Sequence, residues 1–233
     1  MRTSTPLTPL SKLPDFDPRT VPVLGVDNHL PAVPHGRLAP DALRQRFRDP
    51  PPWQPEIRDE PVWVSRAPVP ASVLIPVVSR ARPTVLLTQR TAHLSSHSGQ
   101  IAFPGGKQDA DDTDIISTAL REAREEVGLA SNLVQVMGTL PTYRTGSGFI
   151  ITPVVGLVSE GFVPAPNAFE VEEVFEVPLE FLMDPANHRR HAIVAEGVRR
   201  DWLSMPYTDE RAERFIWGAT AGMLRNLYRF LQV

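Results

Sequence analysis

Three glutamates lie close together on a predicted helix. Glu122, Glu125 and Glu126 occupy positions i, i+3 and i+4 of a segment with helical periodicity. At about 100° per residue, their side chains span an arc of roughly 100° on one side of that helix. Carboxylates this close raise one another's pKa unless a cation is present. Such a set of hard oxygen ligands suits Mg²⁺ or Mn²⁺, especially beside a substrate phosphate.

The same residues also allow a simpler interpretation. Mixed-charge segments such as REAREEV are common on solvated helix faces, where Arg121 and Glu125 would form an ordinary i,i+4 ion pair. The glutamates alone do not decide between the two. The combination with FPGG upstream and Gly128 downstream favours the functional interpretation.

A helix over residues 111–129 would position these glutamates. Asp112, Thr113 or Asp114 can cap its start, and Gly128 lies where a helix commonly ends. The apolar side chains fill the arc beside the carboxylates, so the glutamates should project from the rim of the core. These apolar positions are Ile115, Ile116, Ala119, Leu120, Ala123 and Val127.

Apolar runs rich in β-branched residues predict the strands around this helix. Residues 191–195 and 200–205 should form a hairpin, and residues 213–231 a closing helix. Strands on both sides of one central helix, with a second helix last, predict an α/β fold, a sandwich around a mixed sheet. The other predicted strands are residues 71–79, 84–90, 100–103, 133–140, 149–159 and 171–179.

Composition excludes several classes of protein. The 233 residues contain no cysteine, which excludes disulfides, a thiol nucleophile and cysteine zinc sites. A net charge of −3 argues against general binding of nucleic acid. No apolar run approaches the roughly 18 residues of a membrane helix, and the start of the chain lacks the apolar core of a secretory signal. We therefore expect a cytoplasmic protein with neither nucleic acid nor membrane as a partner.

The prolines are unevenly distributed along the chain. Thirteen of its 25 prolines fall within residues 1–61, where extended, wrapping structure is expected. We predict a proline-rich arm and packed lead-in over residues 1–65, with a short helix opening at Pro40, and a catalytic domain over residues 66–233. The arm could cover a sheet edge or swap onto a second subunit, which leaves a homodimer as an alternative.

Residues 106–129 resemble the Nudix box, G-x5-E-x7-R-E-U-x-E-E-x-G-U with U apolar. Gly106 matches the first glycine. Asp112 stands at the first glutamate position, and one additional residue separates it from Arg121. The second half matches without exception at Arg121, Glu122, Ala123, Glu125, Glu126, Gly128 and Leu129.

The residues upstream of the box are similar to the coenzyme A pyrophosphatase-like branch of the Nudix hydrolases. LLTQRTAHLSSHSGQIAFPGG, residues 86–106, follows that branch's pattern, roughly L-L-T-x-R-[SA]-x3-R-x3-G-x3-F-P-G-G. Ser95 takes the place of an arginine, whose bidentate contact to phosphate would be lost. This departure leaves ADP-ribose or NADH open as alternative substrates.

The resemblance implies a Nudix-like α/β/α sandwich and metal-dependent hydrolysis of a diphosphate linkage by water. The implied substrate is coenzyme A or acyl-coenzyme A, split into 3′,5′-ADP and (acyl-)4′-phosphopantetheine. Mg²⁺ or Mn²⁺ would be held first by Glu122 and Glu126, with Glu125 as a third ligand or the base that orients water. Glu170 is the candidate base outside the box. A non-catalytic ligand-binding module is the remaining alternative.

Further roles follow from the same resemblance. Gly105 and Gly106 would let the backbone approach the metal closely. Arg121, with Asp112, would brace the loop. Arg90 and Lys107 are candidate phosphate contacts, each with a solvated surface position as the alternative.

Other patterns favour structural roles. His93 and His97 are spaced like a metal pair but lack a third ligand, so surface positions are expected. The pairs Arg189–Arg190 and Arg199–Arg200 could meet the 3′-phosphate of coenzyme A, but solvated hairpin ends are expected.

Overall fold

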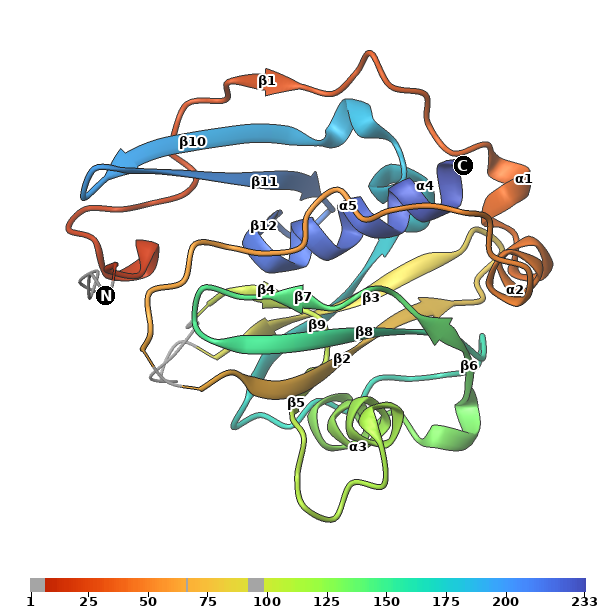
Figure 1. Ribbon diagram of the computed structural model, residues 1–233. Helices are drawn as coiled ribbons and strands as arrows, with labels where there is room; N and C mark the ends of the chain where they lie inside the picture. The colour runs from red at the N-terminus through yellow and green to blue at the C-terminus, as the bar shows by residue number, and fades with distance from the viewer. Residues whose placement is uncertain (1–6, 66, 92–98) are drawn as a thin grey trace.

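The computed structural model describes residues 7–65, 67–91 and 99–233. Its layers follow one another in the order sheet A, helix α5 (Gly218–Gln232), sheet B and helix α3 (Ile115–Val127), as Figure 1 shows. Sheet A has the strand order β1 (Gly25–Val26), β10 (Arg189–Ala195), β11 (Val198–Thr208) and β12 (Glu213–Trp217). Sheet B has the order β4 (Ile101–Ala102), β3 (Thr84–Arg90), β2 (Val69–Val78), β8 (Phe149–Val158) and β6 (Val134–Thr139). Three further strands pair with members of this order: β5 (Gly105–Lys107) with β2, β7 (Tyr143–Arg144) with β8, and β9 (Val171–Pro178) with β3.

Sheet B is mixed. Strands β2 and β8 run parallel along their whole length, from Val69 opposite Phe149 to Val78 opposite Val158, whereas their other neighbours are antiparallel. Strand β2 is apolar on both faces because both are covered. Ile75 packs in the core below α5, and Leu74 packs in the core above α3. The predicted sandwich around a mixed sheet is therefore confirmed, and sheet A adds a further layer over α5.

Helix α3 begins and ends where local chemistry favours it. Asp114 is the N-cap, and its carboxylate accepts a hydrogen bond from the Ser117 N–H at 2.7 Å while the Ser117 hydroxyl caps in return. Gly128 ends the helix in the left-handed region at φ 71°. Ala119, Ala123 and Val127 are buried against sheet B. This orientation turns Glu122 and Glu126 toward β5.

The proline-rich segment packs along the main body. It contains α1 (His35–Leu38) and α2 (Pro40–Arg48), with Leu38 and Leu43 buried in the large core. Strand β1 extends sheet A along β10. Residues 58–63 lie beside residues 144–146 through backbone hydrogen bonds. The division of the chain at residue 65 stays a prediction.

Buried ion pairs connect this proline-rich segment to the last helix, α5. The Arg225 guanidinium is almost wholly buried and lies 3.1 Å from the Asp27 carboxylate and 2.7 Å from that of Glu56. Arg190 pairs with the same two carboxylates. These interactions hold positions 27 and 56 against α5 and β10, because breaking a buried pair leaves an uncompensated charge.

One prediction for the C-terminal third of the chain, the start of its last helix, is wrong. The predicted helix over residues 213–231 begins only at Gly218, and residues 213–217 form β12, antiparallel to β11. Phe215 and Ile216 favour a strand once a partner is available, and Gly218 at φ 62° breaks the chain direction between strand and helix. The predicted hairpin of residues 191–195 and 200–205 is present as β10 and β11. The short helix predicted at Pro40 is α2, and a further short helix, α4 (Leu179–Leu182), follows β9.

Candidate active site

Glu126 lies buried between α3 and the glycine strand β5. Only 3% of its side chain is exposed. One carboxylate oxygen accepts a hydrogen bond from the Gly105 N–H at 3.1 Å, and the other lies 3.4 Å from the Arg90 guanidinium. Among the described residues, one backbone donor and one distant guanidinium leave most of the hydrogen-bonding capacity of this carboxylate unused.

Burial changes the protonation of this glutamate. Loss of solvent raises the pKa of Glu126 to about 7, and the negative charges of Glu122 and Glu170 add to the rise against the opposing effects of Arg90 and Gly105. Burial also raises the pKa of Glu122, and Glu125 and Glu170 act in the same direction. The acidic side chains are therefore close enough to repel, and a cation placed among them would be stabilised.

The two glycines of β5 permit close contacts with two different elements, strand β2 and helix α3. A Cβ at Gly106 would overlap the Glu122 carboxylate, and a Cβ at Gly105 would lie 2.6 Å from the Val73 Cα. Gly105 is therefore needed for β5 to lie this near β2, and Gly106 leaves the space that the Glu122 carboxylate occupies. The neighbour of Gly106 is a carboxylate, and the close approach of this backbone to a metal stays a prediction.

Arg121 connects the acidic helix to the loop before it. Its guanidinium donates to both oxygens of Asp112, at 2.9 and 3.0 Å, and to the Lys107 carbonyl at 3.1 Å. Hydrogen bonds from Arg121, with further donors at Asp109 and Thr118, hold the pKa of Asp112 well below its usual range. The shorter aspartate thus reaches Arg121 in spite of the additional residue.

The same guanidinium also contacts two of the glutamates. Nη1 of Arg121 lies 3.0 Å from Glu122 and 3.0 Å from Glu125. The pair of Arg121 and Glu125 is the ordinary i,i+4 ion pair expected on a solvated face, and Glu125 is half exposed. Glu122 and Glu126 differ because they are turned toward β5 and away from solvent.

The remaining candidate residues surround this centre at different depths. Glu170 lies in the turn before β9, where its carbonyl accepts from the Thr91 N–H at 3.1 Å, and its charge affects both Glu122 and Glu126. Arg90 is three-quarters buried beside Glu126. Lys107 is exposed at the end of β5. Three positions singled out in the sequence, His93, Ser95 and His97, lie outside the described residues.

A divalent cation fits the donors present. Across residues 7–65, 67–91 and 99–233, no three Asp, Glu or His side chains converge on one point. Glu122 and Glu126 nevertheless supply one partly buried and one buried carboxylate on the same side of α3, beside a backbone with no Cβ. Mg²⁺ commonly takes one or two carboxylates and completes its coordination with water and substrate phosphate. Glu122 and Glu126 are the residues that would hold it.

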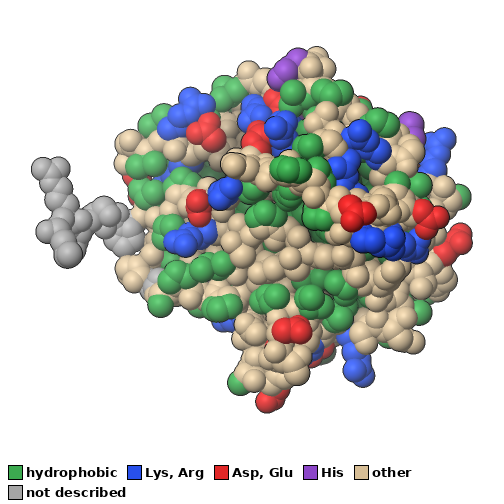
Figure 2. Space-filling model, turned by 45° about the vertical axis from the view of Figure 1, so that its right-hand side comes forward, with side chains coloured by type: hydrophobic (Ala, Val, Ile, Leu, Met, Phe, Trp, Pro, Cys, Tyr) green, Lys and Arg blue, Asp and Glu red, His purple; other side chains and the backbone are tan. Residues whose placement is uncertain are grey.

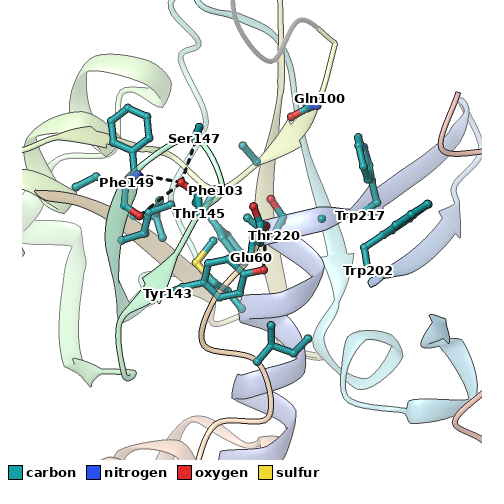
Figure 3. Close-up of a pocket in the computed structure, with 18 of the residues that line it drawn as sticks. Glu60, Gln100, Phe103, Tyr143, Thr145, Ser147, Phe149, Trp202, Trp217 and Thr220 are labelled. Carbon is teal, nitrogen blue, oxygen red and sulfur yellow. Dashed lines mark hydrogen bonds between the residues drawn. The ribbon is translucent and has the colours of Figure 1, made fainter. Parts of the chain in front are cut away.

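A cavity of about 410 Å³ opens beside this centre and extends between the two sheets. Arg90, Gly105, Gly106 and Lys107 line it together with residues of β7, β8, β11, β12 and α5. Figure 3 shows Trp202 and Trp217 on one side of the cavity and Thr145, Ser147 and Phe149 on the other, with Glu60 and Tyr143 between them.

Glu60 is the residue that sequence reasoning missed. Its carboxylate accepts from the Tyr143 hydroxyl at 3.0 Å and from the Gly146 N–H at 2.9 Å. These bonds join the proline-rich segment to the loop of residues 144–148. No local signal marks Glu60, since the acidic residues of PEIRDEP look alike until the fold places one of them at the cavity.

One expectation for the arginine pairs is wrong. Arg200, predicted as a solvated hairpin end, is 2% exposed and lines the cavity. The alternation of β11 explains the difference, because Arg199 faces solvent and its neighbour therefore faces inward.

The NUDIX domain pattern matches residues 68–196 of this chain. The chain belongs to the Nudix family. It is a Nudix hydrolase, an enzyme acting on diphosphate-containing substrates, and members of the family generally require a divalent cation, typically Mg²⁺ or Mn²⁺. The chain is 43% identical over 157 residues to the uncharacterized Nudix hydrolase NudL of Yersinia pestis, which covers 67% of this chain and 77% of that protein. NudL of Yersinia pseudotuberculosis gives the same values.

Solved structures of other Nudix proteins are similar over about half of this hydrolase. An Ap4A hydrolase of C. elegans is 21% identical, covering 51% of this chain and 85% of its own, with a TM-score of 0.41. RenU of M. smegmatis is 26% identical, covering 49% and 72%, with a TM-score of 0.40. The matched family region ends before β11, β12 and α5 and excludes the proline-rich segment.

The surface of the hydrolase carries both signs of charge. On the face drawn in Figure 2, Lys and Arg alternate with Asp and Glu, in keeping with a net charge of −3. A surface of this kind does not favour general binding to a polyanion. Among the described residues, no helix combines the length and apolar character needed to cross a membrane.

Proposed function

We propose that this Nudix hydrolase cleaves the diphosphate of coenzyme A or acyl-coenzyme A, with Mg²⁺ or Mn²⁺ as its cofactor. The products would be 3′,5′-ADP and (acyl-)4′-phosphopantetheine. The observation that carries the proposal is the coenzyme A-type segment LLTQR…FPGG, which leads directly to Gly105 and Gly106. The backbone of these two glycines lies against Glu126 and Glu122.

The side chains of the acidic helix have distinct proposed roles. Glu122 and Glu126 would hold the divalent cation, with Glu126 in its ionised form. When bound, the cation neutralises diphosphate charge and makes water a better nucleophile. Arg121 positions Glu122 and Glu125 from its anchor on Asp112. Glu125 or Glu170 accepts the proton of the attacking water.

Two positively charged side chains are proposed to bind the diphosphate. Arg90 and Lys107 both line the cavity, as do Gly105 and Gly106. A planar guanidinium can contact two phosphate oxygens at once, whereas the lysine acts as a point charge. In the structure Arg90 faces Glu126, so substrate binding should redirect it from that carboxylate to a phosphate.

A substrate panel tests the proposal. The purified chain would be incubated with Mg²⁺ or Mn²⁺ and, separately, with coenzyme A, acyl-coenzyme A, ADP-ribose, NADH and diadenosine polyphosphates, with products resolved by chromatography. We expect 3′,5′-ADP from the coenzyme A substrates at the highest kcat/KM. Faster turnover of ADP-ribose or NADH would replace coenzyme A as the substrate, and no turnover of any compound would favour a binding module. Glu126→Gln is the matched inactive control.

A further inference from the structure

A row of paired residues crosses four strands on the floor of the cavity. Lys107 on β5 lies opposite Ala71 on β2, which lies opposite Ile151 on β8. Ile151 in turn lies opposite Tyr143 on β7, and all four residues line the cavity. With about 4.8 Å between neighbouring strands, Tyr143 is roughly 14 Å across the sheet from β5. A diphosphate is shorter than this, so the floor at Tyr143 would meet the part of a ligand that extends beyond a diphosphate bound at β5.

The carboxylate of Glu60 holds Tyr143 in this position. Glu60 belongs to residues 58–63, which we call the strap, and it lies beside Tyr143 (Figure 3). The Tyr143 hydroxyl donates to one oxygen of the carboxylate at 3.0 Å, and the Gly146 N–H donates to the other at 2.9 Å. A Cβ at Gly222 of α5 would lie 2.9 Å from the hydroxyl oxygen, so the helix closes the space on another side of the ring. Tyr143 is 3% exposed, and its position depends on both neighbours.

The loop of residues 144–148 forms the wall beside Tyr143. Its Thr145 and Ser147 side chains line the cavity, with their hydroxyl oxygens 2.9 Å apart. The strap holds the backbone of this loop, because the Trp63 N–H donates to the Gly146 carbonyl at 3.0 Å. A Cβ at Gly146 would overlap the Trp63 ring. The loop therefore depends for its shape on contacts with the strap, and the bond from the Gly146 N–H to the strap carboxylate is one of them.

The strap is itself fixed to helix α5. Asn226 on that helix is 2% exposed, and its side-chain oxygen accepts from the N–H groups of Glu56 and Ile57 at 2.9 and 3.1 Å. Its amide nitrogen donates to the Ile57 carbonyl at 2.6 Å. The strap and α5 lie outside residues 68–196, the matched family region, whereas β7 and the loop lie within it. The shape of a wall within the family region is therefore set from outside that region.

We propose that Glu60 is a positioning residue for substrate binding. By accepting from both Tyr143 and Gly146, it sets the end of the cavity that contacts the portion of the substrate beyond the diphosphate. Because Tyr143 lies three strands away from β5, Glu60 would touch neither the diphosphate nor the cation, and it should act on KM and not on kcat. The inference rests on the proposed function for the compounds that test it.

Steady-state kinetics of three variants test the proposal, with the compound that the wild type turns over fastest in the substrate panel. Glu60→Ala removes two hydrogen bonds, so KM should rise about tenfold while kcat changes by about twofold at most. Tyr143→Phe removes one of them, so KM should rise about threefold. Glu60→Gln should stay close to wild type, because the glutamine oxygen can accept from the Gly146 N–H while its amide donates to the Tyr143 hydroxyl. Arg58→Ala is the matched control, because Arg58 is exposed on the same strap and does not line the cavity.

Binding of the two halves of coenzyme A tests the same role without any hydrolysis. Calorimetry in the presence of Mg²⁺ would measure the affinity of adenosine 3′,5′-bisphosphate and of 4′-phosphopantetheine for the wild type and for Glu60→Ala. We expect the affinity for one half to fall about tenfold, which identifies the portion that lies at Tyr143, and the affinity for the other half to stay within about twofold.

Different outcomes overturn the positioning role and the proposed function. An unchanged KM in Glu60→Ala, a kcat that falls as much as KM rises, or a Glu60→Gln variant as impaired as Glu60→Ala would overturn the positioning role. Equal loss of affinity for both halves would do the same. Turnover or binding of another panel compound in place of coenzyme A would refute the proposed function, and the KM or affinity for that compound would still test Glu60. Neither binding nor turnover of any panel compound would refute both. If Glu60→Ala fails to fold, Tyr143→Phe provides the same comparison in kinetics and in binding.

Discussion

The carboxylate of Glu126 accepts a hydrogen bond from the Gly105 N–H at 3.1 Å in a position where 3% of the side chain is exposed. This contact joins the acidic helix to the glycine strand, and it places a carboxylate where solvent cannot stabilise its charge. The arrangement is unfavourable for the metal-free fold and suited to a cation. Stability and activity should therefore respond in opposite directions when this charge is removed.

We predict that Glu126→Gln stabilises the metal-free protein at pH 8 and abolishes most of its activity. The folded pKa of about 7 exceeds the ordinary 4.5, so the folded state holds this proton more tightly than the unfolded chain. The stability from this group is fully present below pH 4.5 and is lost as pH rises through 7, a change of about 3 kcal/mol. Glutamine keeps an acceptor for Gly105 and avoids that loss.

Thermal unfolding in EDTA measures the stability effect. The Tm of Glu126→Gln should exceed that of the wild type by several degrees at pH 8 and by much less at pH 5. Mg²⁺ should raise the Tm of the wild type more than that of the variant. Hydrolysis by the variant should fall by orders of magnitude. A lower Tm at pH 8, or activity within tenfold of the wild type, would contradict the assignment.

A second prediction concerns the brace of Arg121 and Asp112. Asp112→Asn keeps the size of the side chain and removes the charge that receives two hydrogen bonds from Arg121. We expect a loss of about 1–3 kcal/mol in the free energy of unfolding. We also expect kcat to fall more than KM rises, because Arg121 would turn toward Glu122 and Glu125 and displace them. Asp111→Asn, at the exposed neighbouring position, is the control.

A double-mutant cycle separates this brace from a general effect of charge. Asp112→Asn and Arg121→Gln, alone and together, should show a coupling free energy of at least about 1 kcal/mol by urea unfolding. Additive effects would mean that the two side chains act independently.

The two glycines of β5 should respond differently to a methyl group. At Gly106 the added Cβ meets only the Glu122 carboxylate, a movable side chain, so Gly106→Ala should fold and lose at least about tenfold in Mg²⁺ affinity, or about 1.4 kcal/mol. At Gly105 the Cβ meets the backbone of β2 at Ser72 and Val73, so Gly105→Ala should destabilise the sheet itself. Metal titration followed by Tm distinguishes the two. Gly161→Ala, where a Cβ meets nothing within 4 Å, is the matched control.

The parts of the fold that local chemistry determines could be predicted from the sequence. The acidic helix has apolar residues at helical spacing, a capping aspartate and a glycine that ends it, and each of these acts within a few residues. The resemblance implied that Asp112 and Arg121 form a pair. The structure contains this pair although one additional residue separates the two, because the loop before the helix accommodates that residue. For residues 213–217, helical spacing was misleading, since pairing with β11 outweighed it.

The cavity between the two sheets could not be predicted, because its residues meet only in the folded chain. Glu60 and Tyr143 are 83 positions apart, and the shape of the loop between residues 144 and 148 brings the Gly146 N–H to the same carboxylate. Trp217 falls within the closing helix predicted over residues 213–231, but it ends strand β12 at the cavity. Long-range packing of this kind leaves no periodic signal in the sequence.

A final prediction concerns acid stability. His188 is fully buried, with Nε2 2.8 Å from the Leu182 carbonyl and Nδ1 3.0 Å from the Arg225 guanidinium, so the ring is neutral. Burial, with the charge of Arg225, lowers the pKa of His188 to about 4 from 6.5. Between pH 6.5 and 4 the unfolded chain therefore binds a proton that the folded protein does not. The free energy of unfolding should fall by about 3 kcal/mol across that window.

Urea unfolding at pH 7, 6, 5 and 4 measures this loss in wild type and in His188→Gln. The variant should be less stable than the wild type at pH 7, because the bond with Arg225 is lost. It should nevertheless lose less stability on acidification, because glutamine does not titrate. His29→Gln, at an exposed position, should reproduce the wild-type pH dependence. Parallel curves for wild type and His188→Gln would show that other groups cause the acid sensitivity, and Arg225 would then hold His188 without linking it to pH.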